Sequence, residues 1–350
     1  MAPIGIALIG GGIFIKQAHI PAVLATPSLE VKAVYSRSLK SAKESAALLP
    51  NGGEGVDLYS SEEGGGGYAD VLKRDDVSGV IIALPIANQP EYIKAALDAG
   101  KHVLAEKPVA PNVSQGRELI EYYHSIKART GATWSCAEQM RCMPNYIFGA
   151  AEARKLGKIT GFRAIVEFMT KEDNPYYNTE WRKNPTHDYG FILDGGVHWA
   201  ASLRMLLGDD VAETVSGFSH TASAYLPSPD TLQGIVRTKY GASGAFLVSC
   251  GSTLPAKSEF SVACERGSVT VSRDNITVSR TDGSEPQVTI KYSAEGVKYE
   301  VQAWAAALEA GKPDPRLAPE EGLADAEFLL GMLKSADAGG VPQNLSLQHV

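Results

Sequence analysis

A Gly-rich turn, Gly10 to Gly12, follows a short apolar run near the start of the chain and precedes a helical pattern. The pyrophosphate of a dinucleotide needs close backbone approach and free amide donors at the start of a helix. Gly10 and Gly12 supply the turn and the clearance, and we include Ile13 and Phe14 in the predicted cofactor site. Ile15 stands where the fingerprint has a small residue, so we expect looser packing of the helix on its strand. The place of this turn after the first strand predicts dinucleotide binding.

The end of the second predicted strand indicates which dinucleotide is bound. An NAD site normally has Asp or Glu there to hold the ribose 2'-hydroxyl. This chain has Ser36 and Arg37 instead, with Lys40 close behind and no acid before Glu44. A hydroxyl and a guanidinium suit a 2'-phosphate, which a carboxylate would repel. The sequence therefore predicts NADP(H); the alternative is that Arg37 is a solvated surface residue.

Glu106 and Lys107, followed by a proline, come directly after a predicted strand over residues 101–104. Ligands of open α/β sheets bind at the carboxyl ends of the strands. This position gives weight to a tripeptide that is otherwise common on protein surfaces. Leu84 and Pro85 close the preceding strand, and we assign them, with Glu106 and Lys107, to the predicted cofactor site.

A third signal is the pair Asp194 and His198, in a segment that continues into an apolar helical pattern. A spacing of four residues places both side chains on one side of a helix, which we expect to begin near Gly195. A carboxylate raises the pKa of a nearby histidine and a lysine lowers it, so such groups can tune a base toward neutral pH. The alternative is that Asp194 only caps the helix and His198 is a core residue.

Together these motifs resemble the glucose-fructose oxidoreductase, inositol dehydrogenase and MocA-like family (Gfo/Idh/MocA), whose members carry a Glu-Lys-Pro at this position. The resemblance implies an N-terminal Rossmann domain and a C-terminal domain built on a large open sheet. It also implies that Lys107 is the active-site lysine and that Asp194 and His198 help to form the catalytic group. Trp181 and Arg182 resemble the Trp-Arg pair that many relatives place beside the cofactor.

The chain departs from the family pattern at two places. Ala201 stands where relatives often have an Asp, and Glu138 and Gln139 stand where Asn and Arg are common. We expect Glu138, Gln139 and His187 to border the substrate. Because these departures fall at the expected pocket, they leave the substrate open among aldoses, inositols, diols and other carbonyl compounds.

The chemistry that fits is hydride transfer between a nicotinamide and a carbon that bears a hydroxyl or carbonyl oxygen. In the oxidation direction His198 would take the hydroxyl proton, Lys107 would hydrogen-bond the same oxygen, and Asp194 would orient one of them. The sequence leaves open which of Lys107 and His198 is the formal base, and in which direction the reaction runs. The alternative function is a catalytically silent nucleotide-binding sensor or transcriptional regulator of the same fold.

The helices and strands that must position these residues follow two different patterns in the two halves of the chain. The first half alternates short apolar strands with helices, such as Glu91–Ala99 before Gly100, which predicts parallel βαβ units. The second half has closely spaced strands, which predict a mostly antiparallel sheet, and ends in two helices. The predicted strands are 4–9, 31–35, 79–84, 101–104, 161–168, 215–220, 234–240, 245–249, 258–262, 268–271 and 288–292, and the last helices are 297–310 and 319–336. We therefore predict an α/β Rossmann domain over 1–130 and an α+β substrate-binding and oligomerisation domain over 131–350.

Composition narrows the class of protein. The 350 residues are 44% hydrophobic and 21% charged, which is typical of a globular chain, and the net charge of -7 argues against nucleic acid as a partner. No apolar run is long enough to span a membrane. The four cysteines lack paired spacing, so we expect buried thiols in a cytoplasmic protein. The remaining histidines, His19 among them, show no metal-ligand spacing, so we predict no metal. An exposed apolar sheet face predicts a homodimer or homotetramer.

Overall fold

The computed structural model divides into two compact units. It describes residues 2–62, 66–272, 275–289 and 295–348. Unit 1 contains Met1–Gln139 and Glu295–Pro319, and unit 2 contains Met140–Ala294 and Glu320–Val350. The division after residue 139 differs from the predicted boundary at 130 because strand β6 completes the sheet of unit 1. The helix at 296–310, which the sequence assigns to the second domain, also belongs to unit 1.

Unit 1 is a doubly wound parallel sheet with the strand order β3-β2-β1-β4-β5-β6. The predicted Rossmann fold is therefore confirmed. Its strands are β1 Ile4–Ile9, β2 Leu29–Ser36, β3 Asp57–Ser60, β4 Gly79–Ile82, β5 His102–Glu106 and β6 Trp134–Ala137. The sequence missed β3 and β6, because each has only four residues and includes polar side chains. The strand order reverses between β1 and β4, which is where ligands bind in this architecture.

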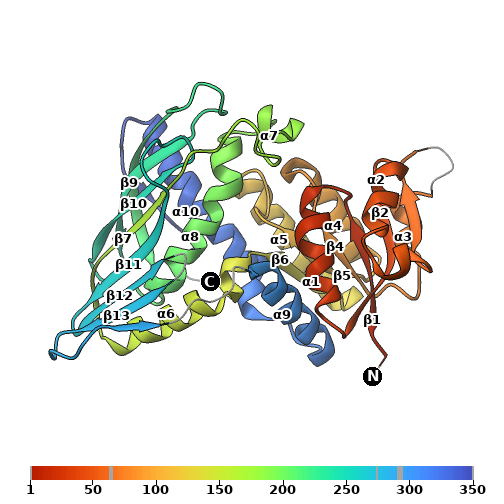
Figure 1. Ribbon diagram of the computed structural model, residues 1–350, viewed down its shortest axis with the longest axis horizontal. Helices are drawn as coiled ribbons and strands as arrows, with labels where there is room; N and C mark the ends of the chain where they lie inside the picture. Colours follow the sequence, from red (N-terminus) through yellow and green to blue (C-terminus); the bar gives the residue numbers. More distant parts are fainter. Residues whose placement is uncertain (1, 63–65, 273–274, 290–294, 349–350) are drawn as a thin grey trace. The chain divides into compact units, whose positions relative to one another are not determined.

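Helices cover both faces of this sheet, and one of them returns from far along the chain (Figure 1). Helix α9 contacts α1, the π-helix η1 and β6, and its Trp304 lies against Gly79, where any larger residue would clash with the indole ring. The predicted helix before Gly100 is confirmed as α4, and Gly100 takes the positive φ of 73° that favours glycine after a helix. The helical elements of unit 1 are η1 Ile15–His19, α1 Ile20–Leu24, α2 Leu39–Ala46, η2 Pro50–Gly53, α3 Tyr68–Leu72, η3 Ile86–Asn88, α4 Gln89–Asp98, α5 Val113–Thr130, α9 Gly296–Ala310 and η5 Pro315–Leu317.

Unit 2 is built on a nine-stranded sheet in the order β14-β13-β12-β11-β7-β10-β9-β8-β15. Among the described strands of this sheet only β7 and β10 pair in parallel, so the predicted mostly antiparallel sheet is confirmed. Its strands are β7 Ile159–Glu167, β8 Ala212–His220, β9 Thr231–Thr238, β10 Ser243–Ser249, β11 Lys257–Cys264, β12 Gly267–Ser272, β13 Ile276–Arg280, β14 Gln287–Thr289 and β15 Gln343–Asn344. The predicted strand 288–292 appears as β14, and its residues 290–292 lie outside the described ranges.

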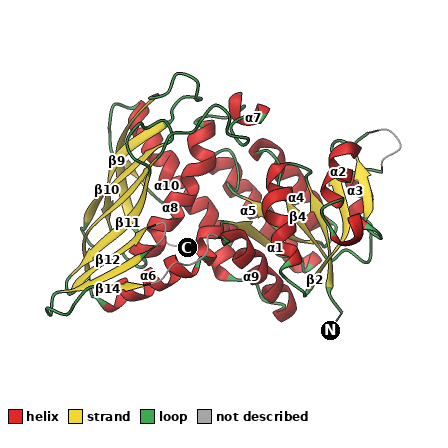
Figure 2. Cartoon of the chain, viewed as in Figure 1, coloured by secondary structure: helices red, strands yellow, loops and turns green. Residues whose placement is uncertain are grey.

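Three long helices cover one face of this sheet (Figure 2). Helix α8 packs on β7 and β11, α6 packs on β12 and β13, and Phe328 of α10 stacks edge-on against Phe246 of β10. The helical elements are η4 Gln139–Cys142, α6 Pro144–Lys155, α7 Glu180–Lys183, α8 Gly190–Leu207 and α10 Pro319–Asp337. No helix within the described ranges is long and apolar enough to cross a membrane. All four cysteines are free and buried, which confirms the prediction for the thiols.

Candidate functional site

The Gly-rich turn lies at the end of β1, where the strand order of unit 1 reverses. Gly10 has φ of 127°, its amide donates to the Tyr35 carbonyl at 2.8 Å, and a Cβ there would lie 2.5 Å from the Ala83 carbonyl oxygen. Only glycine fits such a position. Gly12 is exposed, and a Cβ at Gly12 would meet nothing within 4 Å. The turn thus offers close backbone and open space, the two features that a pyrophosphate needs.

The residues after the turn form an unusual helix start. Ile13 and Phe14 are half-buried, and Phe14 lies edge-on to the His19 ring with the ring centres 5.3 Å apart. Ile15 is fully buried, so its larger side chain is accommodated inside the unit. Residues Ile15–His19 form the π-helix η1 before α1 begins. Such turns are frequent at functional sites.

At the end of β2 the structure places a hydroxyl and a free cation. Ser36 is buried, and its Oγ would lie 2.9 Å from a Cβ at Gly11. Arg37 is exposed and has no ion-pair partner among the described residues. Leu84 and Pro85 are half-buried after β4. All four residues thus lie at or just after the carboxyl ends of β2 and β4.

The structure also brings an acid to this edge that sequence reasoning missed. Ser36 pairs with Ser60 in the β2–β3 register, and two residues later the Glu62 carboxylate accepts a hydrogen bond from the Leu39 amide at 3.0 Å. The first acid after Ser36 in the sequence, Glu44, lies with its carboxylate 2.6 Å from the Lys16 ammonium. The pairing of β2 with β3 brings the Glu62 carboxylate to the end of β2, where Arg37 follows. The spacing of residues along the sequence does not show this pairing.

Lys107 follows β5 directly, at the carboxyl edge of the sheet. Its side chain is half-buried, its peptide bond to Pro108 is cis, and Val109 and Ala110 are buried behind it. Glu106, the last residue of β5, is buried. The sheet therefore anchors the backbone before the lysine, and buried residues anchor the backbone after it.

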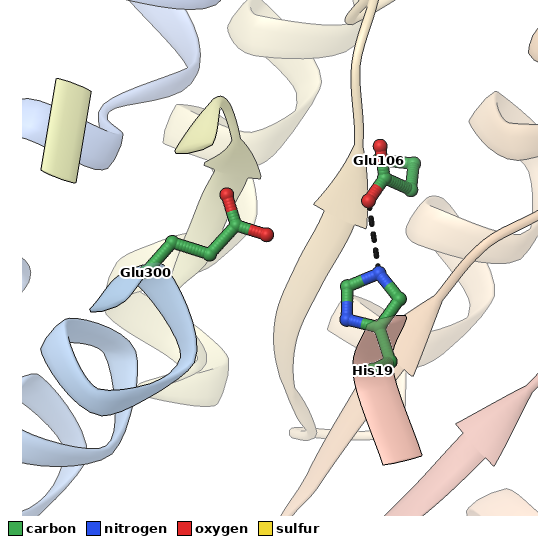
Figure 3. A group of neighbouring side chains, drawn as sticks. All are labelled: His19, Glu106 and Glu300. Carbon is green, nitrogen blue, oxygen red and sulfur yellow. Dashed lines mark hydrogen bonds and ion pairs between the residues drawn. The ribbon is translucent and has the colours of Figure 1, made fainter. Parts of the chain in front are cut away.

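Glu106 belongs to a buried group with His19 and Glu300 (Figure 3). His19 Nε2 lies 2.8 Å from Glu106 Oε1, and nitrogen and oxygen atoms of the three side chains lie within 4.8 Å of one another. Burial raises the pKa of Glu300 well above its ordinary value, the charges of Glu106 and Glu138 raise it further, and the charge of Lys107 lowers it. No metal was expected from the sequence, but these side chains are of the types that hold metal ions.

Two of the three predicted substrate residues lie in unit 1. Glu138 is 1% exposed and follows β6, and it is one of the charges that act on Glu300. Gln139 lies against Gly296 at the start of α9, where a Cβ would come within 2.7 Å of its side-chain oxygen. Glu138 thus acts on the buried group that contains Glu106, and Gln139 lies at the start of the helix that carries Glu300.

In unit 2, helix α8 carries the predicted Asp194 and His198. The expected start near Gly195 is wrong: the helix begins at Gly190, where a Cβ would clash with Pro185 at 2.3 Å. Asp194 consequently lies inside the helix rather than at its cap, so the capping interpretation is wrong as well. The spacing of four inside one helix places Asp194 and His198 on one side of it. Ala201 is fully buried.

Asp194 has a charged partner that links two predicted residues. Arg182 Nε donates to Asp194 Oδ2 at 2.8 Å, and the guanidinium lies 4.0 Å from the centre of the Trp181 ring. Stacking on an indole and pairing with a carboxylate fix the guanidinium in one orientation. His187 lies nearby: burial lowers its pKa, and the charges of Asp194 and Asp188 oppose that shift. Neither ring nitrogen of His187 has a hydrogen-bond partner among the described residues.

Comparison with known proteins identifies the family. The pattern described as "Oxidoreductase family, NAD-binding Rossmann fold" matches residues 4–131, and the "GFO/IDH/MocA C-terminal domain" matches residues 149–270. The chain belongs to the Gfo/Idh/MocA oxidoreductase family. The glycine turn, Arg37 and the Glu106-Lys107 pair fall in the first matched region, and Arg182, Asp194 and His198 fall in the second.

Individual Gfo/Idh/MocA relatives match nearly the whole chain. A dehydrogenase named FPY6 from Fusarium mangiferae is 33% identical over 347 residues, covering 96% of this chain and 97% of its own. A 1,5-anhydro-D-fructose reductase from Ensifer adhaerens is 29% identical and covers 95% of this chain and 96% of its own. The crystal structure of an oxidoreductase from Thermotoga maritima superimposes with a TM-score of 0.86 at 26% identity, with 99% of each chain covered.

Proposed function

We propose that this protein is an NADP(H)-dependent oxidoreductase that transfers hydride between the nicotinamide and a hydroxyl or carbonyl carbon of a sugar, cyclic polyol or related small molecule. The observation that carries the proposal is that Lys107 at the carboxyl edge of the Rossmann sheet is retained together with Asp194 and His198 on one helix. The relatives named as a dehydrogenase and as a 1,5-anhydro-D-fructose reductase support a sugar-like substrate.

The residues of unit 1 fit a dinucleotide. Gly10 leaves no room for a side chain, Gly12 opens onto free space, and η1 follows them with its amides at a helix start. Arg37 offers an exposed guanidinium, which can pair with a 2'-phosphate through two parallel hydrogen bonds. The bound nicotinamide supplies the hydride chemistry, and the protein supplies position and proton handling.

We assign the proton handling to Lys107 and His198. Lys107 donates a hydrogen bond to the substrate oxygen and balances the negative charge that develops there as a hydroxyl is oxidised. His198 holds the proton of that hydroxyl, or returns it to the oxygen when a carbonyl is reduced. Asp194 orients this group, and Arg182 fixes the Asp194 carboxylate through their 2.8 Å contact.

The open face of the unit 2 sheet supports a homodimer or homotetramer. Leu247 of β10 lies opposite Ile165 of β7 on one side and opposite Gln233 of β9 on the other. Ile235 of β9 is two residues from Gln233, so it points to the same face of the sheet. Ile235 is 56% exposed, and Phe218 on β8 is 65% exposed. A second copy of the chain would cover this apolar face. Sedimentation of the purified protein measures the assembly, and Ile235→Lys should dissociate it; a monomeric parent protein would refute this part of the proposal.

The buried free thiols support a cytoplasmic location, where thiols stay reduced. The alternative function, a nucleotide-binding sensor, needs the cofactor turn but not Lys107, Asp194 and His198. The deciding experiment incubates the protein with reduced or oxidised NADP and a panel of sugars, inositols, diols and their ketones, and follows the absorbance of the reduced nicotinamide. Turnover of one compound supports the enzyme. Tight NADP(H) binding without turnover of any compound would favour the sensor.

A further inference from the structure

Glu300 of α9 is a fully buried carboxyl group to which no described residue donates a hydrogen bond. It is 0% exposed, and neither of its oxygens has a hydrogen-bond partner among the described residues. Figure 3 shows its carboxyl group directed toward the side where His19 and Glu106 lie. An ionised carboxylate in such a place would cost several kcal/mol or more, so a group of this kind takes up a proton or is met by a cation.

The charges around Glu300 decide between these two solutions. Helix α9 packs against α1, η1 and β6. α1 carries no ionisable side chain, β6 contributes only the Cys136 thiol, and η1 contributes His19 together with Lys16, which is paired with Glu44. The charges that act on Glu300 are those of Glu106, Glu138 and Lys107.

These surroundings favour a proton over a metal ion. The charges of two carboxylates, Glu106 and Glu138, and of one ammonium, Lys107, act on Glu300, so a third negative charge at Glu300 would be poorly compensated. A divalent ion would have to displace the 2.8 Å contact between His19 and Glu106 and tolerate the nearby ammonium of Lys107. A proton on Glu300 requires neither change.

We propose that Glu300 is a neutral carboxylic acid that joins His19 and Glu106 in a buried proton-holding cluster, and that this cluster positions Lys107 through Glu106. The role assigned to Lys107 rests on the proposed function. His19 Nε2 lies 2.8 Å from Glu106 Oε1, and neither His19 Nδ1 nor the Glu300 carboxyl has a hydrogen-bond partner within the described part of the chain. The three groups lie within 4.8 Å, a span that one bridging water can close.

The cluster ties three separate parts of unit 1 together. His19 ends η1, which follows the Gly-rich turn, Glu106 ends β5, and Glu300 comes from α9. The backbone of Glu106 continues directly into Lys107. Glu300 is therefore a positioning residue, because it acts through Glu106.

Infrared spectroscopy tests the proton directly. The parent protein at neutral pH should show the carbonyl stretch of a protonated carboxyl group, and the Glu300→Gln variant should lack it. Glu309→Gln, the same change at an exposed residue of α9, is the matched control and should retain the band. If the parent shows no such band, or if Glu300→Gln retains it, the proposal fails. Elemental analysis that finds one bound metal per chain, lost in Glu300→Gln, would also overturn it.

Kinetics test the positioning role. Gln imitates the neutral acid, so Glu300→Gln should keep kcat within a few-fold and leave the pH profile of kcat/KM unchanged across the neutral range. Glu300→Ala should lower kcat by on the order of 10- to 100-fold with little change in cofactor KM, as misplacement of a reacting group does. A shifted neutral pH profile in Glu300→Gln would show that Glu300 is ionised. Since the infrared band requires no turnover, a parent protein with the band but without activity would refute the proposed function alone.

Discussion

Arg182 and Asp194 are twelve positions apart, and their side chains meet with Nε 2.8 Å from Oδ2. Both side chains are mostly shielded, at 15% and 13% exposure, so solvent screens the pair only partly. The carboxylate that the sequence nominated as a catalytic orienting group is thus itself held by a stacked guanidinium. The two side chains form an ion pair, so we expect a substitution of either residue to change the position of the other side chain.

We expect Arg182→Lys to lower kcat, because an ammonium can neither stack flat on Trp181 nor hold the Asp194 carboxylate in the same plane. Asp194→Asn should also lower kcat, and the double variant should lose less than the sum of the two single effects. A double-mutant cycle on kcat/KM measures the coupling, which for residues in contact is about 0.5–3 kcal/mol. Strictly additive effects would show that the pair is structural only.

Lys107→Ala should keep cofactor binding and lose turnover. Removing an acid-base or charge-stabilising group costs on the order of 100- to 10,000-fold in rate. Fluorescence titration with NADPH checks binding, and steady-state kinetics check turnover. Lys73→Ala, at an exposed lysine of the same unit, is the control and should behave as the parent. Activity of Lys107→Ala within a few-fold of the parent would disprove the catalytic assignment.

His198→Asn should flatten the pH dependence of kcat across the neutral range, because Asn cannot titrate there but has a similar volume. The fold should persist, which circular dichroism verifies. If the pH profile keeps its shape, His198 is not the group that titrates, and its role is that of a core residue. Lys107 would then be the candidate base.

Cofactor preference should depend on Arg37. A charge-assisted hydrogen bond is worth roughly 1.5–3 kcal/mol, so one contact with the 2'-phosphate predicts about 10- to 100-fold preference for NADP(H) over NAD(H). Arg37→Ala should remove most of it, and Ser36→Asp should reverse it by adding a ribose partner and a repelling charge. Removing the carboxylate in Glu62→Gln should raise the preference.

The measurement is kcat/KM for both cofactors on each variant. Lys43→Ala, at an exposed lysine of α2, serves as the control for a general loss of positive charge. Equal use of the two cofactors by the parent, or a preference that survives Arg37→Ala, would show that the 2'-phosphate is held elsewhere or is absent.

Glu300 should make stability depend on pH. Its pKa in the folded protein is raised well above 4.5, so its contribution to stability is fully present below about pH 4.5 and is lost as the pH rises toward the folded pKa. Each pH unit in that window costs about 1.4 kcal/mol. Glu300→Gln lacks this loss, so its Tm should rise relative to the parent as the pH increases. A Tm difference that stays constant with pH would contradict the raised pKa.

Local sequence determined most of the elements and the candidate residues that follow β1 and β5. Apolar runs such as Ile4–Ile9 become buried parallel strands because hydrophobic burial acts on each run wherever it lies. Gly10 is required by its own backbone angle, and Lys107 follows the strand that precedes it in the chain. Such features depend on neighbours in sequence, and they were therefore predictable.

Only the tertiary structure decided which charges meet. The Glu62 carboxylate reaches the start of α2 through the pairing of β2 with β3, and Arg182 reaches Asp194 because the chain folds α7 back onto α8. Glu300 joins His19 and Glu106 because α9, which follows β14 in the chain, belongs to unit 1. The spacing of residues along the chain does not show which distant segments come into contact. Burial and pairing, which set the ionisation of these groups, exist only once the chain has closed on itself.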